Sequence, residues 1–393
     1  MRTAIAVAAV LGVLCSMRVR ARDEVRALWV ARSSLSSPRA IETMVVAAQE
    51  SGFNTLLVEV RGRGDSYFLN GIEPRPNVLA AQPSFDPLAD AIDKAHVRGL
   101  AIHAWINVNL IAGTSVPTAR THIVYKHPEW LMVPRQMADD LTSVGPAGPE
   151  YLGRLMRYVR SRSADLDGLY LSPATAGAVE YTASVVRDIV SRYAVDGVHF
   201  DYVRYPSDDF DYSRDTLTAF RRTLPSNTPA SGNLQSYPMS FPVRWRAFRT
   251  ERLTALVTAL RDAVKSSRPG ASVSIAVTSD PGEAKTRYLQ DWTRWISDGL
   301  TDVVSPSPHD TEHANVSFAA QIAAAHDAAG PHLMWAGIGA HRLSPEQTLA
   351  DIKAARQLGA AGIVVFSYDT LITPPRGSSY LSQLGKAAFT APF

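Results

Sequence analysis

The sequence predicts an α/β protein, a (β/α)8 TIM barrel with long loops at its C-terminal mouth. Short apolar runs alternate with helical stretches, a pattern typical of a parallel sheet. There are eight such runs, the number that closes a (β/α)8 barrel. They are ALWVARS (27–33), NTLLVEVR (54–61), LAIHAWINVN (100–109), DGVHFDYVRYP (196–206), SVSIAVTSD (272–280), LTDVVSPSP (300–308), HLMWAGIGA (332–340) and GIVVFSYDT (362–370).

The stretches between the runs carry helix signals. Residues 37–52, 86–99 and 344–360 each open with Ser or Asp followed by proline, which is typical of a capped helix start. Residues 180–197 and 251–270 end at a glycine, a common helix stop. An open doubly wound sheet is the structural alternative, but it would normally carry a glycine-rich phosphate loop after its first strand. ARSSLSSP (31–38) is not such a loop.

Two connections are much longer than the others. Residues 110–170 join the third and fourth runs, and residues 207–240 follow the fourth. Long loops at the mouth of a barrel usually shape a substrate cleft. No further repeat or linker divides the chain, so we expect residues 22–393 to form one domain.

The N-terminal segment 1–21 predicts a signal peptide. It has an early arginine and an apolar run over residues 4–15, too short to span a membrane comfortably. We expect cleavage after Ala21, a secreted or periplasmic protein, and no stable membrane span afterwards. A lipoprotein anchor at Cys15 ranks second because Leu14 is bulkier than the residue that lipidation prefers, and an uncleaved anchor ranks third.

Composition narrows the class of partner. Hydrophobic residues make up 46% and charged residues 20% of the chain, as in folded globular proteins. The net charge is only +3, and no run of Lys or Arg is concentrated on one element. We therefore expect no nucleic-acid partner.

Alternation along the strands separates two sets of side chains. Val198 and Phe200 share one side of their strand, and His199 and Asp201 share the other. In a barrel one side meets the helices and the other meets the axis. The same alternation groups further polar or aromatic residues near strand ends, namely Glu59, Arg61, His103, Trp105, Asn107, Asp280 and Asp369. The C-terminal ends of barrel strands carry the active site in barrel enzymes, so this pattern favours an enzyme.

Asp201 stands out within DGVHFDYVRYP. A carboxylate there could simply cap the next helix or pair with Arg204. The alternation and the neighbouring Tyr202 and Tyr205 favour a functional role instead. Aromatic rings beside carboxylates suit sugars, whose apolar faces stack and whose hydroxyls form hydrogen bonds.

Taken together, these motifs resemble the glycosyl-hydrolase-like family 10, secreted bacterial barrels that include peptidoglycan-cleaving glycosidases. The motifs that carry the resemblance follow the family's order: VRALWV, GFNTLLVEVRGRGDSYF, FDPLADAIDKAHVRGLAIHAWIN, HPEWLM, LYLSPATAGAVEYTASVVRDIVSRYAVDGVHFDYVRYP and LGAAGIVVFSYDT. The resemblance implies a TIM-barrel glycoside hydrolase acting on a bacterial cell-envelope polysaccharide.

The resemblance also marks individual residues. The positions it implies are Arg61, Gly64, Asp65, His103, Trp105, Asn107, Asp201, Arg204, Tyr205 and Tyr368. The chain departs from the family's pattern at the mouth. Glu59 stands where glutamine is expected, Ser172 stands where Asp or Asn is usual, and the turns 277–283 and 304–310 differ from the usual ones.

Glycoside hydrolysis usually needs two carboxyl groups. Asp201 is the first choice for the nucleophile or base. Glu59, two strands away, and Asp280, one strand away, rank equally as its partner. Further candidates are Glu283, Asp65 and Asp369. The residues expected to bind substrate are Arg61, Asp65, His103, Trp105, Asn107, His199, Tyr202, Arg204, Tyr205, Tyr368 and Asp369.

Two other classes compete with a glycosidase. A non-catalytic carbohydrate-binding barrel is favoured by the altered turns at the mouth. A metal-dependent hydrolase would draw on His103, His199, Asp201 and Asp280, with His309 and His313 on a loop. No HxH or HExxH spacing supports the metal site, so we expect neither a metal nor a cofactor.

Overall fold

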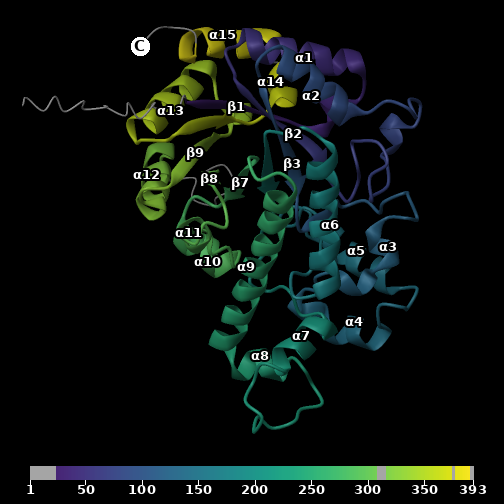
Figure 1. Cartoon of the computed structure of the whole chain (residues 1–393). Coiled ribbons are helices and arrows are strands. Elements are labelled where there is room, and N and C mark those ends of the chain that lie inside the picture. Colours follow the sequence, from purple (N-terminus) through teal and green to yellow (C-terminus); the bar gives the residue numbers. More distant parts are fainter. Residues whose placement is uncertain (1–23, 308–315, 374–376, 390–393) are drawn as a thin grey trace, which may run out of the picture.

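The eight predicted strands form a closed parallel barrel in the computed structural model, which describes residues 24–307, 316–373 and 377–389 (Figure 1). Around the barrel the strands follow the order β1-β10-β9-β8-β7-β6-β3-β2. Their bounds are β1 Val25–Val30, β2 Thr55–Arg61, β3 Ala101–Asn107, β6 Gly197–Asp201, β7 Ser272–Val277, β8 Val303–Pro306, β9 Leu333–Ile338 and β10 Gly362–Val365. The predicted barrel is confirmed. The predicted signal peptide with Cys15, and the loop residues His309 and His313, lie outside the described residues.

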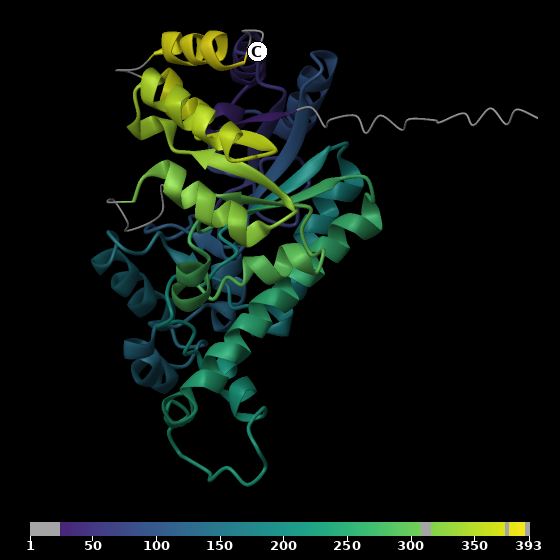
Figure 2. The ribbon, with the colours of Figure 1, turned by 90° about the vertical axis from the view of Figure 1, so that its left-hand side faces the viewer.

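Helices surround the barrel and follow most of its strands (Figures 1 and 2). Their bounds are α1 Pro38–Glu50, α2 Pro87–Val97, α3 Ile123–Lys126, α4 Ala138–Val144, α5 Tyr151–Ser161, α6 Ala176–Arg192, α7 Arg214–Arg221, α8 Ser236–Ser240, α9 Pro242–Ser267, α10 Pro281–Arg287, α11 Trp292–Ser297, α12 Phe318–Ala329, α13 Pro345–Gln357, α14 Tyr368–Ile372 and α15 Ser378–Ala388. Short 3-10 turns occur at Arg32–Leu35, Asn77–Leu79, Pro128–Trp130, Arg135–Met137 and Ala340–Arg342. In the described part of the chain, no helix is both long and apolar enough to cross a membrane.

The predicted helix starts are capped as their sequences suggest. The Ser37 hydroxyl accepts a hydrogen bond from the Ala40 N–H, and the Asp86 carboxylate accepts one from Ala89. Ser344 and Gln347 cap α13 reciprocally. Each cap satisfies a backbone N–H that has no partner within the helix, and the proline after it needs none.

The sides of β6 divide as the alternation predicts. Val198 and Phe200 are buried in the main core, between the strands and the helices. His199 points to the interior of the barrel, where its ring centroid lies 5.4 Å from that of Trp29. Asp201 ends the strand, and its Cα is paired in register with that of Asn107 on β3.

The barrel interior is filled rather than hollow. Seven buried side chains form a cluster along the axis: Ala27, Trp29, Leu57, Trp105, Val303, Trp335 and Val364. Large aromatic rings give this cluster most of its apolar area. Among the described residues, the interior of the barrel is therefore closely packed.

Strand β2 breaks the alternation at one point. Its pairing with β3 shifts register between Glu59 and Arg61, so that Glu59 pairs with Trp105 and Arg61 with Ile106. A bulge of this kind re-aims the residue that follows it. The expectation that Arg61 shares the side of Glu59 is therefore wrong.

The two long connections form a folded insertion rather than open loops (Figures 1 and 2). Strands β4, Leu110–Ala112, and β5, Leu169–Tyr170, pair antiparallel at its base. Helices α3, α4, α5, α7 and α8 complete it, and α9 runs from the barrel to its far end, where it meets α8. A second hydrophobic core, which includes Leu155, Phe220 and Trp245, holds the insertion together.

Candidate active site

A cavity of about 490 Å³, here called the mouth cavity, opens at the carboxyl ends of the barrel strands. It is lined by Ala31, Arg32, Ser33, Glu59, Arg63, Trp105, Asn107, Asp201, Tyr202, Arg204, His341, Arg342 and Phe366. Six of these were predicted from the sequence, namely Glu59, Trp105, Asn107, Asp201, Tyr202 and Arg204. Its size is that of a small-molecule or sugar site.

Glu59 is a buried carboxylate with several donors. One oxygen lies 2.7 Å from Arg32 Nη1, and the other accepts a hydrogen bond from the Arg32 backbone N–H at 3.1 Å. Asn107 Nδ2 donates to the same carboxylate at 3.0 Å. These three donors hold the carboxylate of Glu59 in one orientation.

Asn107 connects Glu59 to the aromatic wall of the cavity. Its side-chain oxygen accepts a hydrogen bond of 3.0 Å from Trp105 Nε1, while its amide nitrogen donates to Glu59 and to the Gly62 carbonyl. Every polar atom of the Asn107 side chain is therefore used. The network fixes the Trp105 indole edge at the cavity.

Asp201 lies across Asn107 from Glu59. Glu59 on β2 and Asp201 on β6 are separated by β3, which places the two strands roughly 10 Å apart. Both carboxylates line the same cavity, and they are its only acidic side chains among the described residues. Asp201 Oδ1 accepts a hydrogen bond of 2.6 Å from the N–H of Tyr202, whose φ of 52° is unusual for a bulky residue.

Tyr202 and Arg204 form an aromatic and cationic rim. The Arg63 and Arg204 guanidinium groups lie 5.7 Å and 5.3 Å from the Tyr202 ring centroid. Arg204 also lies 4.7 Å from the ring of Tyr288 and pairs with Asp167 at 3.5 Å. Burial raises the pKa of Tyr202 far above its usual range, so its hydroxyl group stays protonated and uncharged.

Several lining residues were missed by the sequence reasoning. Arg32 and Ser33 follow the first strand, His341 and Arg342 follow the seventh, and Phe366 follows the eighth. Their positions just beyond strand ends are a signal that could have identified them. Arg63 lies inside the motif RGRGD, but the alternation selected Arg61 in its place.

Arg61 does not reach the mouth cavity. It is fully buried and forms a two-pronged ion pair with Glu73, with Nε and Nη2 at 2.8 Å and 2.7 Å from the carboxylate oxygens. It also donates to the carbonyls of Asn107 and Val108. Arg61 therefore holds the end of β3 in place rather than contacting substrate.

Asp65 and Asp369 hold loops at the mouth. Asp65 accepts hydrogen bonds from the backbone N–H groups of Gly62 and Arg63, at 3.0 Å and 2.9 Å. Asp369 accepts one of 2.6 Å from the N–H of Ala31, next to Arg32. Neither lines the mouth cavity, so both act by positioning the arginines that do.

His103 and His199 lie below the cavity, inside the barrel. Burial lowers the pKa of His103 to about 4. Burial, with a further contribution from His103, lowers that of His199 to about 3. His199 Nδ1 is 2.9 Å from the hydroxyl of Ser274. Both histidines are neutral at pH 7 and belong to the packed interior rather than the substrate surface.

Tyr205, Tyr368 and Asp280 also lie away from the mouth cavity. Tyr205 is fully buried and Tyr368 is almost so, both in the main core. Asp280 is exposed and caps α10 by accepting a hydrogen bond of 2.7 Å from the Glu283 N–H, while Glu283 pairs with Arg287. Of the two carboxylates ranked as the partner of Asp201, Glu59 shares the mouth cavity with it and Asp280 does not.

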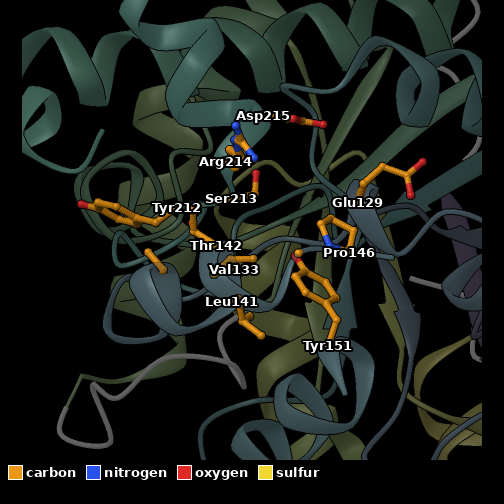
Figure 3. Close-up of a pocket in the computed structure, with 12 residues that line it drawn as sticks. Glu129, Val133, Leu141, Thr142, Pro146, Tyr151, Tyr212, Ser213, Arg214 and Asp215 are labelled. Atoms are coloured by element: carbon orange, nitrogen blue, oxygen red, sulfur yellow. The ribbon is translucent and has the colours of Figure 1, made fainter. Parts of the chain in front are cut away.

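The insertion contains another cavity of about 230 Å³ between α4, α5 and α7 (Figure 3). Tyr151, Tyr212 and Asp215 are among its lining residues. None of the predicted site residues lines this cavity, and Glu59 and Asp201 lie in the mouth cavity instead. Among the described residues, no group of three or more His, Cys, Asp or Glu side chains is placed to hold a metal ion.

A closed (β/α)8 barrel with two carboxylates and aromatic rings at its mouth defines a TIM-barrel protein of the glycoside hydrolase-like type. The sequence pattern of the glycosyl hydrolase-like 10 family matches residues 24–330, and the chain belongs to this family. The family resemblance predicted from the motifs is confirmed.

Named relatives agree with this assignment. Glycosyl hydrolase DigH from Escherichia coli K12 is 24% identical over 278 residues, covering 66% of this chain and 55% of the relative. Glycosyl hydrolase YngK from Bacillus subtilis strain 168 is 20% identical over 317 residues, covering 72% and 53% respectively. The chain therefore spans about half the length of these two relatives.

Solved structures share the fold. The PgaB (BpsB) glycoside hydrolase domain from Bordetella bronchiseptica superposes with a TM-score of 0.66 at 14% identity, covering 94% of this chain and all of that domain. A β-galactosidase from Bacillus circulans superposes with a TM-score of 0.59 at 12% identity, covering 92% of this chain and 55% of that one.

Proposed function

We propose that this protein is a secreted glycosidase that hydrolyses O-glycosidic bonds in a bacterial cell-envelope polysaccharide, such as the glycan strands of peptidoglycan. The observation that carries the proposal is the presence of Glu59 and Asp201 in one cavity at the barrel mouth. The names of the relatives, both glycosyl hydrolases, support the reaction class. The N-terminal pattern of residues 1–21 supports export.

The two carboxylates suit different steps. Glu59 accepts hydrogen bonds from Arg32 and Asn107, which hold its carboxylate in one orientation. A carboxylate positioned in this way suits attack on the anomeric carbon or activation of water. Proton donation to the leaving oxygen then falls to Asp201, which exchanges the roles expected from the sequence.

The aromatic side chains account for binding and orientation. Trp105 and Phe366 line the inner wall of the mouth cavity, and Tyr202 lines its rim. Flat rings of this kind pack against the apolar faces of sugars, while Asn107 and the arginines supply polar contacts. The sugar unit at the carboxylates is thereby held close to both reacting groups.

The experiment is incubation of the purified protein with isolated cell-wall glycan. We expect new reducing ends to appear with time, and mass spectrometry to identify the cleaved linkage. Boiled protein and a soluble neutral glucan serve as controls for contaminating activity and for specificity. Glycan that is bound and recovered uncut would contradict the proposal.

A non-catalytic carbohydrate-binding barrel is the second candidate function. It is favoured by the ion pair of Glu59 with Arg32 and by the engagement of Asp280 as a helix cap, because both carboxylates ranked as the partner of Asp201 then contact other groups of the protein. The altered turns at 277–283 and 304–310 point the same way. Binding without release of reducing ends would establish this alternative.

A further inference from the structure

A second cavity of about 450 Å³, here called the side cavity, adjoins the mouth cavity. Arg32 and Arg63 line both cavities, so the two meet at these side chains. Segments 74–77 and 112–119 form most of its remaining wall. Together the two cavities form one cleft at the barrel mouth, and each has the volume of a site for a small molecule such as a sugar.

The side cavity carries an excess of positive charge. Arg32, Arg63 and Arg75 line it, whereas Asp65 is its only carboxylate among the described residues. Arg32 is compensated by Glu59, and Asp65 already accepts two backbone N–H groups. Arg63 and Arg75 thus remain without a carboxylate that neutralises their charge in an ion pair.

Neither Arg63 nor Arg75 forms an ion pair with a described carboxylate. Arg63 donates from Nη1 to the carbonyl of Gly62 at 2.8 Å. Arg75 donates from Nη2 to the carbonyls of Gln82 and Phe85, while its Nε and Nη1 are buried without a hydrogen-bond partner. A cleft wall with two uncompensated cations attracts anions.

The turn that presents Arg63 is rigid. Asp65 accepts the N–H groups of Gly62 and Arg63, and His122 Nε2 lies 2.8 Å from the carbonyl oxygen of Arg63. Gly64 has a φ of +64°, and a Cβ there would come within 2.6 Å of His122 Nε2. The backbone of Arg63 is therefore held in place before any ligand binds, which reduces the entropy that the turn loses on binding.

We propose that the side cavity binds a sugar unit that carries a negative substituent, a carboxylate or a phosphate, and that Arg63 determines this specificity. The inference rests on the proposed function, since it extends the same cleft along one direction of the glycan. A guanidinium presents parallel N–H donors that match either anion. The substrate is then an acidic polysaccharide, with its charged unit beside the scissile one.

The test is calorimetric binding to the Asp201→Asn variant, which removes one of the two reacting carboxyl groups so that the ligand stays intact. The ligands are a tetrasaccharide of alternating uronic acid and N-acetylglucosamine, its carboxyl-reduced form, and the reduced form phosphorylated at the same carbon. We expect at least about 10-fold tighter binding of an anionic form than of the reduced form, a difference that corresponds to one charge-assisted contact. The carboxylate and phosphate arms show which anion is preferred.

Arg63→Gln, in the same background, is expected to weaken binding of the anionic ligand about 10-fold more than binding of the reduced ligand. Arg63→Lys should restore part of the preference because the charge returns without the planar fork. Lys353→Gln removes one charge from the exposed face of α13 and is the matched control, expected to change nothing. Thermal melting of each variant verifies that it is folded.

Equal affinity for the acidic and reduced ligands would overturn the inference, as would an equal effect of Arg63→Gln on both. An acidic peptide that competes better than every glycan would also overturn it. This test can fail independently of the proposed function, because the preference for a charged ligand is measured by binding and not by hydrolysis. Cleavage of neutral glycan without charge preference would reject only the side-cavity inference, and charge preference without cleavage would reject only the glycosidase.

Discussion

The guanidinium of Arg32 lies 2.7 Å from the carboxylate of Glu59, although Arg32 follows β1 and Glu59 lies near the end of β2. Arg32 follows β1, and its loop is tied to Asp369 after β10 through the N–H of Ala31. The orientation of Glu59 is thus set by three separate segments that meet at the barrel mouth. Substitutions at these residues are therefore expected to change the rate of glycan cleavage.

Asp201→Asn is expected to keep the fold and to lower the rate of glycan cleavage at least about 100-fold, because the amide cannot exchange the proton that the reaction needs. The measurement is release of reducing ends from cell-wall glycan, with thermal melting as the check on folding. Cleavage near the wild-type rate would remove Asp201 from the mechanism.

Glu59→Gln is expected to lower the rate by a similar factor of about 100, because the second carboxyl group of the mouth cavity is lost. Asp280→Asn is the matched control. Asp280 is exposed and caps α10, and asparagine caps a helix about as well, so neither rate nor stability should change. The reverse outcome, with Asp280→Asn inactive and Glu59→Gln active, would reassign the second carboxylate.

Glu73→Gln is expected to lower the free energy of unfolding by about 3–5 kcal/mol, because it leaves the fully buried Arg61 without its ionic partner. Urea denaturation measures this loss. Glu150→Gln, which breaks the exposed pair with Arg154, is the control and should give no measurable change. If Glu73→Gln left stability intact and only weakened glycan binding, Arg61 would be a substrate-binding residue after all.

Stability is expected to fall as the pH drops from about 6.5 toward 4. The folded-state pKa of His103 is about 4 and that of His199 is about 3, both below the unfolded value of about 6.5. In this window the unfolded chain binds more protons, which costs up to about 1.4 kcal/mol per pH unit for each histidine. Above pH 6.5 neither contributes to the pH dependence.

Urea denaturation at pH 7, 5.5 and 4.5 checks this dependence. His199→Asn, which keeps a polar group beside Ser274, should reduce the slope between pH 6.5 and 4 because one titrating site is removed. An unchanged slope in that variant would show that His199 does not cause the acid sensitivity.

Much of the architecture could be predicted because it depends on local patterns. Eight apolar runs separated by capped helices specify parallel strands with crossover helices, whatever the details of packing. The alternation in β6 correctly separated Val198 and Phe200, which meet the helices, from His199, which lies inside the barrel. The same pattern selected Asp201 and Glu59, which do line one cavity.

The alternation failed where the backbone departs from a regular strand. The register shift in β2 turns Arg61 into a buried ion pair with Glu73 and leaves the mouth to Arg63. A bulge has a weak sequence signal because it depends on how two strands pair rather than on one strand's composition. Asp280 lies away from the mouth cavity for a related reason, since its loop turns at once into α10.

The sequence by itself determined the barrel, the end of the barrel that carries polar groups, and the family, because these follow from periodicity and motif order along the chain. Only the tertiary structure decided which charges meet. The pairing of Glu59 with Arg32, the burial of His103 and the shared cleft at Arg63 join residues from different β/α units. Such contacts depend on closure of the barrel, which brings strand ends together regardless of their distance in sequence.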